Sequence, residues 1–187
     1  MKKYVIMFIL LFASTCYGQS FIDNIGLSYY HGEMLNGVVE SNTHDHSVDR
    51  IILRGGKYFH KFELSGELHG SFLHSDAKRK GISKNAHEIG LNIVGSYHFR
   101  PRLNFDPYIG LLVGGSWLIE KHNQPDFMDS GVLGTFGGMV GMNFSLKKRW
   151  YLNVEYRITH SSDPFHTGDR GRNFHGPLIG LVYYFDR

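Results

Sequence analysis

The sequence predicts an all-β fold, an eight-stranded antiparallel transmembrane β-barrel that follows a cleaved signal peptide. Three observations predict it. The N-terminus has the layout of an export signal, alternating polar and apolar residues recur from about residue 22 to the end, and the connections between these segments are short and long in turn. No linker rich in Pro or Ser interrupts the pattern, so we expect one domain over residues 19–187.

The first residues predict export. Lys2 and Lys3 are followed by an uninterrupted apolar run over residues 5–13, and Gly18 supplies a small residue at the expected cleavage point. This is the layout of a secretory signal peptide, and the run is too short to span a bilayer. Cleavage after Gly18 makes residues 1–18 the signal peptide.

The only cysteine, Cys16, lies within this leader. Lipidation at Cys16 is the alternative, but Thr15 directly before it and Ala13 three residues before it fit a lipoprotein signal poorly. A mature chain without cysteines needs a source of stability other than disulfides, and a closed sheet is one.

Composition favours a barrel and argues against a nucleic-acid partner. The 187 residues include 23 Gly, 11 Tyr and 14 Phe, and the mean hydropathy is only -0.24. Such values are typical of a barrel whose strands are polar on one side. The formal charge of +3 is small, and no basic stretch with interleaved aromatic residues stands out. We therefore expect a membrane-embedded protein that does not bind nucleic acid.

Segments with a two-residue period supply the strands. In residues 61–73 the large apolar side chains share one face and the polar side chains share the other. The same pattern predicts eight strands, over residues 22–32, 47–59, 61–73, 87–100, 106–119, 132–146, 150–162 and 173–185. Lengths of about ten residues or more suit tilted strands that cross a membrane.

The connections between the strands give a second, independent indication. The turns at residues 58–61, 100–104 and 146–149 are short, whereas the segments 33–46, 74–86, 120–131 and 163–172 are longer and polar. This alternation is typical of barrels with tight periplasmic turns and longer extracellular loops.

The placement of charge separates a membrane barrel from a soluble one. A soluble lipocalin-like barrel also has about eight strands, but its charged face points outward. Here seven charged side chains of the strands share one side, where they can pair inside a narrow barrel, and the wide apolar side suits lipid. These side chains are Arg50, Arg54, Glu63, Glu67, Glu88, Glu155 and Arg157.

Polar residues interrupt the apolar face of the last two strands. In residues 150–162 the alternate residues that we expect to face lipid end with His160 and Ser162, at the outer end of the strand. In the final strand the same face includes Asn173 and His175, and either can lie beside His160 in a hairpin. Because polar groups on a lipid-facing wall are costly away from the interface, the cluster calls for a functional explanation.

The residue types fit acyl transfer. A serine hydroxyl such as that of Ser162 is a weak nucleophile, which needs a nearby base and a third group that orients the base. Residues two apart on a strand lie on one face, so His160 can be that base. A polar strand end at the headgroup level, without catalysis, is the alternative that this pattern leaves open.

A segment near the C-terminus resembles the lipid A 3-O-deacylase family of the PagL type. Its matching residues are His160, Ser162, Asp163, Asp169, Gly171 and Asn173. The resemblance implies Ser162 as nucleophile, His160 as general base and Asn173 as the orienting residue, with the other three in supporting loop and oxyanion positions. It implies hydrolysis of an ester-linked acyl chain of lipid A, the membrane anchor of lipopolysaccharide, without a metal or cofactor.

Three positions depart from the family pattern. Asp163 stands where an asparagine usually follows the serine, Asp169 where an asparagine would support the oxyanion, and Asn173 where the characterised type has an acid. A neutral amide can still orient a histidine, but a carboxylate at Asp169 opposes developing negative charge. Two functions stay open, an outer-membrane esterase and a non-catalytic barrel of the same ancestry with a structural or binding role. A homodimer stays open as well.

The remaining histidines have structural interpretations. The stretch His44-Asp45-His46 invites a metal site, but it lies in an expected loop and no third ligand has a defined spacing, so we expect a solvated loop and no metal. His69, His87 and His98 are expected in the polar interior of the barrel.

Overall fold

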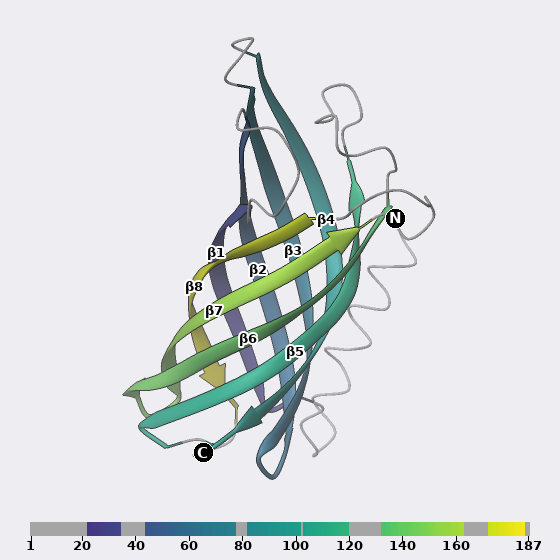
Figure 1. Cartoon of the computed structure of the whole chain (residues 1–187). Coiled ribbons are helices and arrows are strands. Elements are labelled where there is room, and N and C mark those ends of the chain that lie inside the picture. The colour runs from purple at the N-terminus through teal and green to yellow at the C-terminus, as the bar shows by residue number, and fades with distance from the viewer. Residues whose placement is uncertain are drawn as a thin grey trace, which may run out of the picture.

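Eight antiparallel strands pair in sequence order, and the last pairs with the first, so the sheet closes into a barrel (Figure 1). The computed structural model describes residues 22–34, 44–77, 82–101, 103–119, 132–162 and 172–185. The strands are β1 (Asn24–Met34), β2 (His44–Phe59), β3 (Phe62–Ala77), β4 (Ile82–His98), β5 (Phe105–Leu118), β6 (Val132–Lys147), β7 (Trp150–Ser162) and β8 (Arg172–Tyr184). Within these residues no helix has the length and apolar character needed to cross a membrane. The predicted fold class and strand number are confirmed.

The structure extends three strands by three or more residues beyond their predicted ends. β2 begins at His44, β3 ends at Ala77 and β4 begins at Ile82, and β3 and β4 reach beyond the other strands at the upper end of Figure 1. The predicted loops 33–46 and 74–86 are therefore wrong in part, and His44-Asp45-His46 belongs to a strand that pairs with β3. Outside a membrane both faces of a strand can meet water, so backbone pairing continues where the polarity pattern no longer indicates it.

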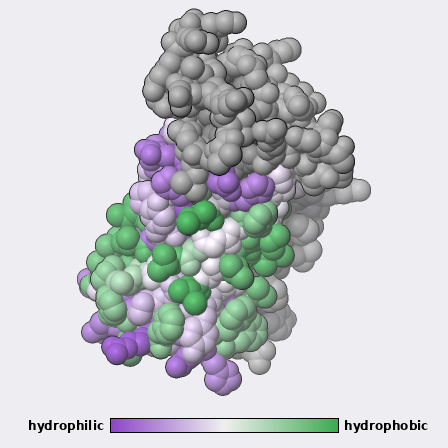
Figure 2. Space-filling view, viewed as in Figure 1, coloured by the Kyte–Doolittle hydropathy of each residue, from purple (hydrophilic) through white to green (hydrophobic). Residues whose placement is uncertain are grey.

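The wall and the interior of the barrel have opposite polarity. Leu111 and Ile93 are 72% and 61% exposed on the wall, whereas Glu67 and Glu155 inside are 1% and 2% exposed. Figure 2 shows the apolar side chains in a zone across the middle of the visible face, with hydrophilic residues beyond it at both edges. An outward apolar zone around a polar interior is the arrangement of a transmembrane barrel.

Aromatic side chains mark the edge of this zone at the end with the short turns. Phe105 packs against Phe144 with ring centroids 5.6 Å apart, and Trp150 packs against Tyr183 at 5.0 Å. Girdles of this kind lie at the membrane interface, and short turns are periplasmic in such barrels. The opposite end, with the long connections, therefore faces outward from the cell.

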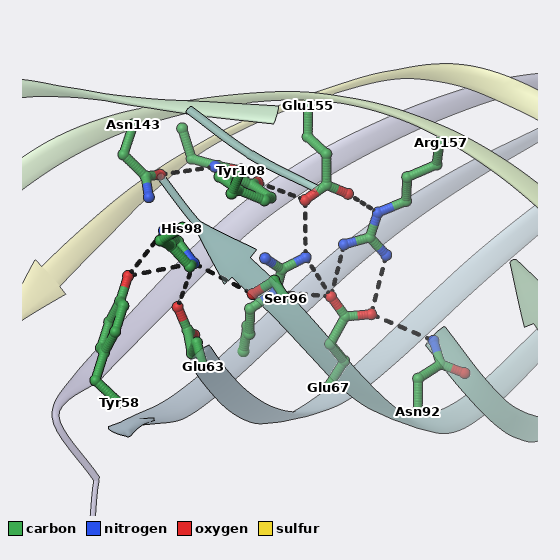
Figure 3. Close-up of polar contacts among 12 residues, drawn as sticks. Tyr58, Glu63, Glu67, Asn92, Ser96, His98, Tyr108, Asn143, Glu155 and Arg157 are labelled. Atoms are coloured by element: carbon green, nitrogen blue, oxygen red, sulfur yellow. Dashed lines mark hydrogen bonds and ion pairs between the residues drawn. The ribbon is translucent and has the colours of Figure 1, made fainter. Parts of the chain in front are cut away.

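Two arginines and two glutamates hold the centre of the interior together (Figure 3). Arg54 and Arg157 each place a guanidinium nitrogen 2.6 Å from Glu67. Both also contact Glu155, Arg54 at 3.0 Å. Glu155 in addition accepts a hydrogen bond from Tyr108 at 2.6 Å. The predicted pairing of charges inside the barrel is confirmed.

Further polar contacts flank this centre towards both ends. His98 bonds to Glu63 at 3.1 Å and to Asp106 at 2.8 Å near the periplasmic turns. Arg50 bonds to Glu88 at 3.2 Å towards the outer end. An eight-stranded barrel is just wide enough for side chains to fill it. The interior is thus a packed core, polar at its centre and apolar where side chains such as Tyr30, Phe174 and Leu178 cluster, and an active site is to be sought on the wall or at the ends.

The predicted placement of the three histidines is partly right. His69 and His98 are buried inside, as expected. The prediction for His87 is wrong, because its neighbour Glu88 points inward and the two-residue period then turns His87 outward. Its ring packs against Phe72 on the wall, with the centroids 4.9 Å apart.

Glycines make room for the large interior side chains. A Cβ at Gly141 would lie 2.4 Å from the ring of Tyr108, and a Cβ at Gly90 would lie 2.4 Å from the imidazole of His69. These positions need glycine because the neighbouring ring occupies the space of a side chain. The high glycine content of the sequence therefore has a packing explanation inside the barrel.

We expect Glu67→Gln to lower the free energy of unfolding by about 3 kcal/mol or more, because it leaves two buried guanidiniums with one carboxylate. Urea unfolding in lipid vesicles measures the change. Glu33→Gln is the control, since Glu33 is exposed and should change stability by less than about 0.5 kcal/mol. Equal effects of the two substitutions would contradict a central role for the buried network.

Candidate active site

The outer end of β7 presents two of the predicted residues on the lipid-facing wall. Thr159 and Ser161 point inward and are 1% and 3% exposed, whereas His160 and Ser162 are partly exposed on the other face. The parity predicted for this strand is confirmed. The sequence produces it because alternate residues of β7, including Asn153, Glu155 and Arg157, are fixed inside by the polar core.

The register between β7 and β8 brings a third predicted residue alongside. His160 and Asn173 are direct cross-strand partners, and the Nδ1 atom of His160 lies 3.0 Å from the amide oxygen of Asn173. The amide oxygen only accepts, so the contact places the proton of a neutral imidazole on Nδ1. Nε2 then carries the free lone pair, which is the state a general base requires.

The neighbouring strand β6 shapes the other side of the site. The ring of Phe136 packs against His160 with the centroids 4.9 Å apart, and Gly134 is the cross-strand partner of Ser162. A glycine there presents no side chain to Ser162. Ser162 therefore meets no side chain from its partner position on β6, and the ring of Phe136 lies two residues further along that strand.

His175, the other predicted neighbour of His160, has a different partner. Its register partner on β7 is Ile158, and its Nδ1 atom is hydrogen-bonded to the hydroxyl of Tyr156. Of the two residues that could lie beside His160, the structure therefore selects Asn173.

The height of the site on the wall follows from strand geometry. Trp150, in the periplasmic girdle, and Ser162 are 162 − 150 = 12 residues apart on β7. At about 3.3 Å per residue and a tilt of about 45°, this is roughly 28 Å along the membrane normal, against an apolar band of about 25 Å. Ser162 therefore lies at the headgroup boundary of the outer leaflet.

Other predicted elements lie outside the described residues. These are the signal peptide over residues 1–18 and the supporting residues Asp163, Asp169 and Gly171. Their roles stay predictions. Within the described ranges, no three His, Cys, Asp or Glu side chains form a group that could hold a metal ion.

The structure also shows a polar cluster that sequence reasoning missed. Asp49 of β2 lies on the outer wall with Tyr29 and His31 of β1 and His74 of β3 around its carboxylate. The sequence contains an indication of this cluster. Asp49 lies two residues before the lipid-facing Ile51 on the same strand, so its carboxylate falls on an apolar face.

Comparison with known proteins places the fold. The family model described as the outer membrane protein beta-barrel domain matches residues 19–185. No curated protein sequence matches the chain.

Three similar solved structures illustrate the likeness. Neisserial surface protein A is 11% identical with a TM-score of 0.57, and the alignment covers 87% of this chain and 96% of that one. OprG from Pseudomonas aeruginosa is 15% identical with a TM-score of 0.56, covering 89% and 97%. The outer membrane enzyme PagL is 12% identical with a TM-score of 0.57, covering 83% and 97%.

At these identities the structural likeness concerns the fold alone. The family model covers residues 19–185 of the 187, and OprG and PagL are outer-membrane proteins. The chain therefore belongs to the outer membrane protein β-barrel domain family and is a protein of the bacterial outer membrane.

Proposed function

We propose that this protein is an outer-membrane esterase that hydrolyses an ester-linked acyl chain of lipid A in the outer leaflet. The observation that carries the proposal is the contact between His160 and Asn173, 3.0 Å long, beside Ser162 on the lipid-facing wall. An oriented histidine next to a serine is the minimal machinery of acyl transfer.

The chemistry follows from these three side chains. Ser162 Oγ attacks the ester carbonyl carbon while its proton passes to Nε2 of His160. The tetrahedral intermediate collapses, the sugar alkoxide leaves with the proton from His160, and the acyl group stays on Ser162. Water, deprotonated by the same histidine, then releases the fatty acid and restores the serine. Asn173 holds the imidazole in its reactive tautomer throughout.

The surroundings support a lipid as substrate. Phe136 and Ile158 are 58% and 52% exposed below the site, so an acyl chain can lie against the wall while its ester reaches the headgroup boundary. A lipid A molecule occupies this position without leaving the membrane. The resemblance of the His160 to Asn173 segment to the deacylase family supports the same substrate.

A non-catalytic barrel is the second candidate, and one observation favours it. Asn173 is neutral, whereas an acid in its place would stabilise the imidazolium formed during the reaction. Neisserial surface protein A and OprG share the fold at similar identity.

We expect Ser162→Ala to abolish release of the acyl chain, because it removes the nucleophile. Mass spectrometry of lipid A from cells that overproduce each protein measures the loss of one acyl chain. Ser161→Ala is the matched control, because the neighbouring Ser161 points inward and bonds to Thr135 at 3.2 Å. Unchanged lipid A in cells with folded wild-type protein would refute the esterase.

We expect Asn173→Glu to raise the rate of acyl release by about tenfold or more, since a carboxylate stabilises the imidazolium that Asn173 only orients. Asn173→Ala should lower the rate, because it leaves the ring without its partner. Initial rates on purified lipid A in detergent measure both. A lower rate for Asn173→Glu would show that this residue is not the orienting group.

A further inference from the structure

A hydrogen-bonded pair of polar side chains lies on the outer wall, closer to the membrane centre than the Ser162 site. The hydroxyl of Tyr156 on β7 is hydrogen-bonded to Nδ1 of His175 on β8, and the ring centroids are 6.0 Å apart. Tyr156 is 43% exposed on the wall, and His175 is partly exposed. The reaction proposed for Ser162 uses neither side chain.

The strand register gives the depth of this pair. His175 is the direct cross-strand partner of Ile158, which lies 162 − 158 = 4 residues before Ser162 on β7. At about 3.3 Å per residue and a tilt of about 45°, this is roughly 9 Å along the membrane normal. The pair therefore lies within the apolar zone, where a polar group is costly unless it is hydrogen-bonded.

The pair has one proton that its own hydrogen bond does not use. A neutral imidazole carries one N–H and a tyrosine carries one O–H. Only one of these protons lies between Nδ1 of His175 and the oxygen of Tyr156, whichever atom donates it. Among the described residues neither side chain has another hydrogen-bond partner, Glu33 opposite His175 on β1 included. One donor on the lipid-facing wall is thus left for a ligand.

We propose that Tyr156 and His175 select substrates whose acyl chain carries an oxygen near its ester end, as a hydroxyl or a branching ester. The unused donor of the pair bonds to this oxygen while the ester lies beside Ser162. An unsubstituted chain offers no acceptor and loses that hydrogen bond. This selection rests on the proposed function, because it concerns the acyl chain that the Ser162 site takes.

The wall connects the two groups of polar residues. Asn173 and His175 are two residues apart on β8, so they share one face of the strand. On β7, Ile158 lies between His160 and Tyr156 and is 52% exposed. An acyl chain that runs from an ester at Ser162 towards the membrane centre therefore passes over Ile158 and reaches the pair. Tyr156 and His175 contact the chain and not the reacting atoms, so they are specificity residues.

The test compares methyl octadecanoate with its 3-hydroxy and 12-hydroxy derivatives, using the purified full protein in detergent. We expect kcat/KM to be about tenfold higher for the 3-hydroxy ester than for the unsubstituted ester. The 12-hydroxy ester should show no such gain, because its oxygen lies beyond the pair. His175→Phe should reduce the ratio to about one without slowing the unsubstituted ester, and Tyr156→Phe should reduce it in part.

The matched control is His87→Phe, because His87 also lies on the outer wall but packs against Phe72 on the β3 and β4 side of the barrel. It should keep the wild-type ratio. Heat-modifiable gel mobility confirms the fold of each variant. A structural clamp between β7 and β8 would instead slow all three esters equally in His175→Phe.

A binding measurement does not depend on turnover. In Ser162→Ala protein with ¹⁵N-labelled histidine, we expect the 3-hydroxy ester to shift the imidazole nitrogen signals of His175 in the NMR spectrum. Methyl octadecanoate should leave these signals in place. The signals of His175 are those that disappear in His175→Phe.

The outcomes separate the two proposals. A wild-type protein that hydrolyses all three esters equally, a preference that persists in His175→Phe, or an equal loss of rate on all three esters overturns selection by the pair and leaves the esterase standing. A hydroxyl-dependent shift without any hydrolysis supports recognition of the chain by the pair and refutes the esterase. Absence of both refutes both.

Discussion

The rest of the structure depends on the pairing of Glu67 with Arg54 and Arg157 inside the barrel. A buried guanidinium without a carboxylate is strongly destabilising, so Arg54 of β2 and Arg157 of β7 fix the position of β3, which lies beside β2 and across the barrel from β7. Once these three side chains point inward, the two-residue period fixes the outward residues of all three strands. The same pairing closes the interior, because it fills the space that a channel would need.

The outer wall is consequently where function can lie. Its apolar residues meet lipid, and polar residues are tolerated only near the headgroups. Two groups of polar side chains lie at the outer ends of the strands, His160 with Asn173 on β7 and β8, and Asp49 with its three donors on β1 to β3. Both contain a histidine that contacts a residue of a neighbouring strand. Under the proposed function, the closed barrel acts on lipids that stay in the membrane.

Much of this arrangement could be predicted from the sequence, and the exceptions have physical causes. The outward orientation of His160 and Ser162 could be predicted from the sequence, because polar and apolar residues alternate along β7 without interruption. The register that selects Asn173 over His175 could not, since hairpin alignment is fixed by pairing along the whole strand. The polar cluster around Asp49 was not predicted, because the sequence does not show that His31 and His74 of the adjacent strands lie beside this carboxylate. The residues added to β2, β3 and β4 are mostly polar in the sequence, so an alternation of polar and apolar residues could not reveal them.

The central claim is that the Ser162 site faces lipid at the outer-leaflet boundary while its sequence neighbours face a closed interior. Spin labels placed singly at Ile158, Ser161 and Ser162 in vesicles test this through collisions with oxygen, which dissolves in lipid, and with a polar nickel complex. We expect oxygen to dominate at 158, the nickel complex to gain access at 162, and both to be largely excluded at 161. A label at 161 that is open to either reagent, with 162 protected, would contradict the account.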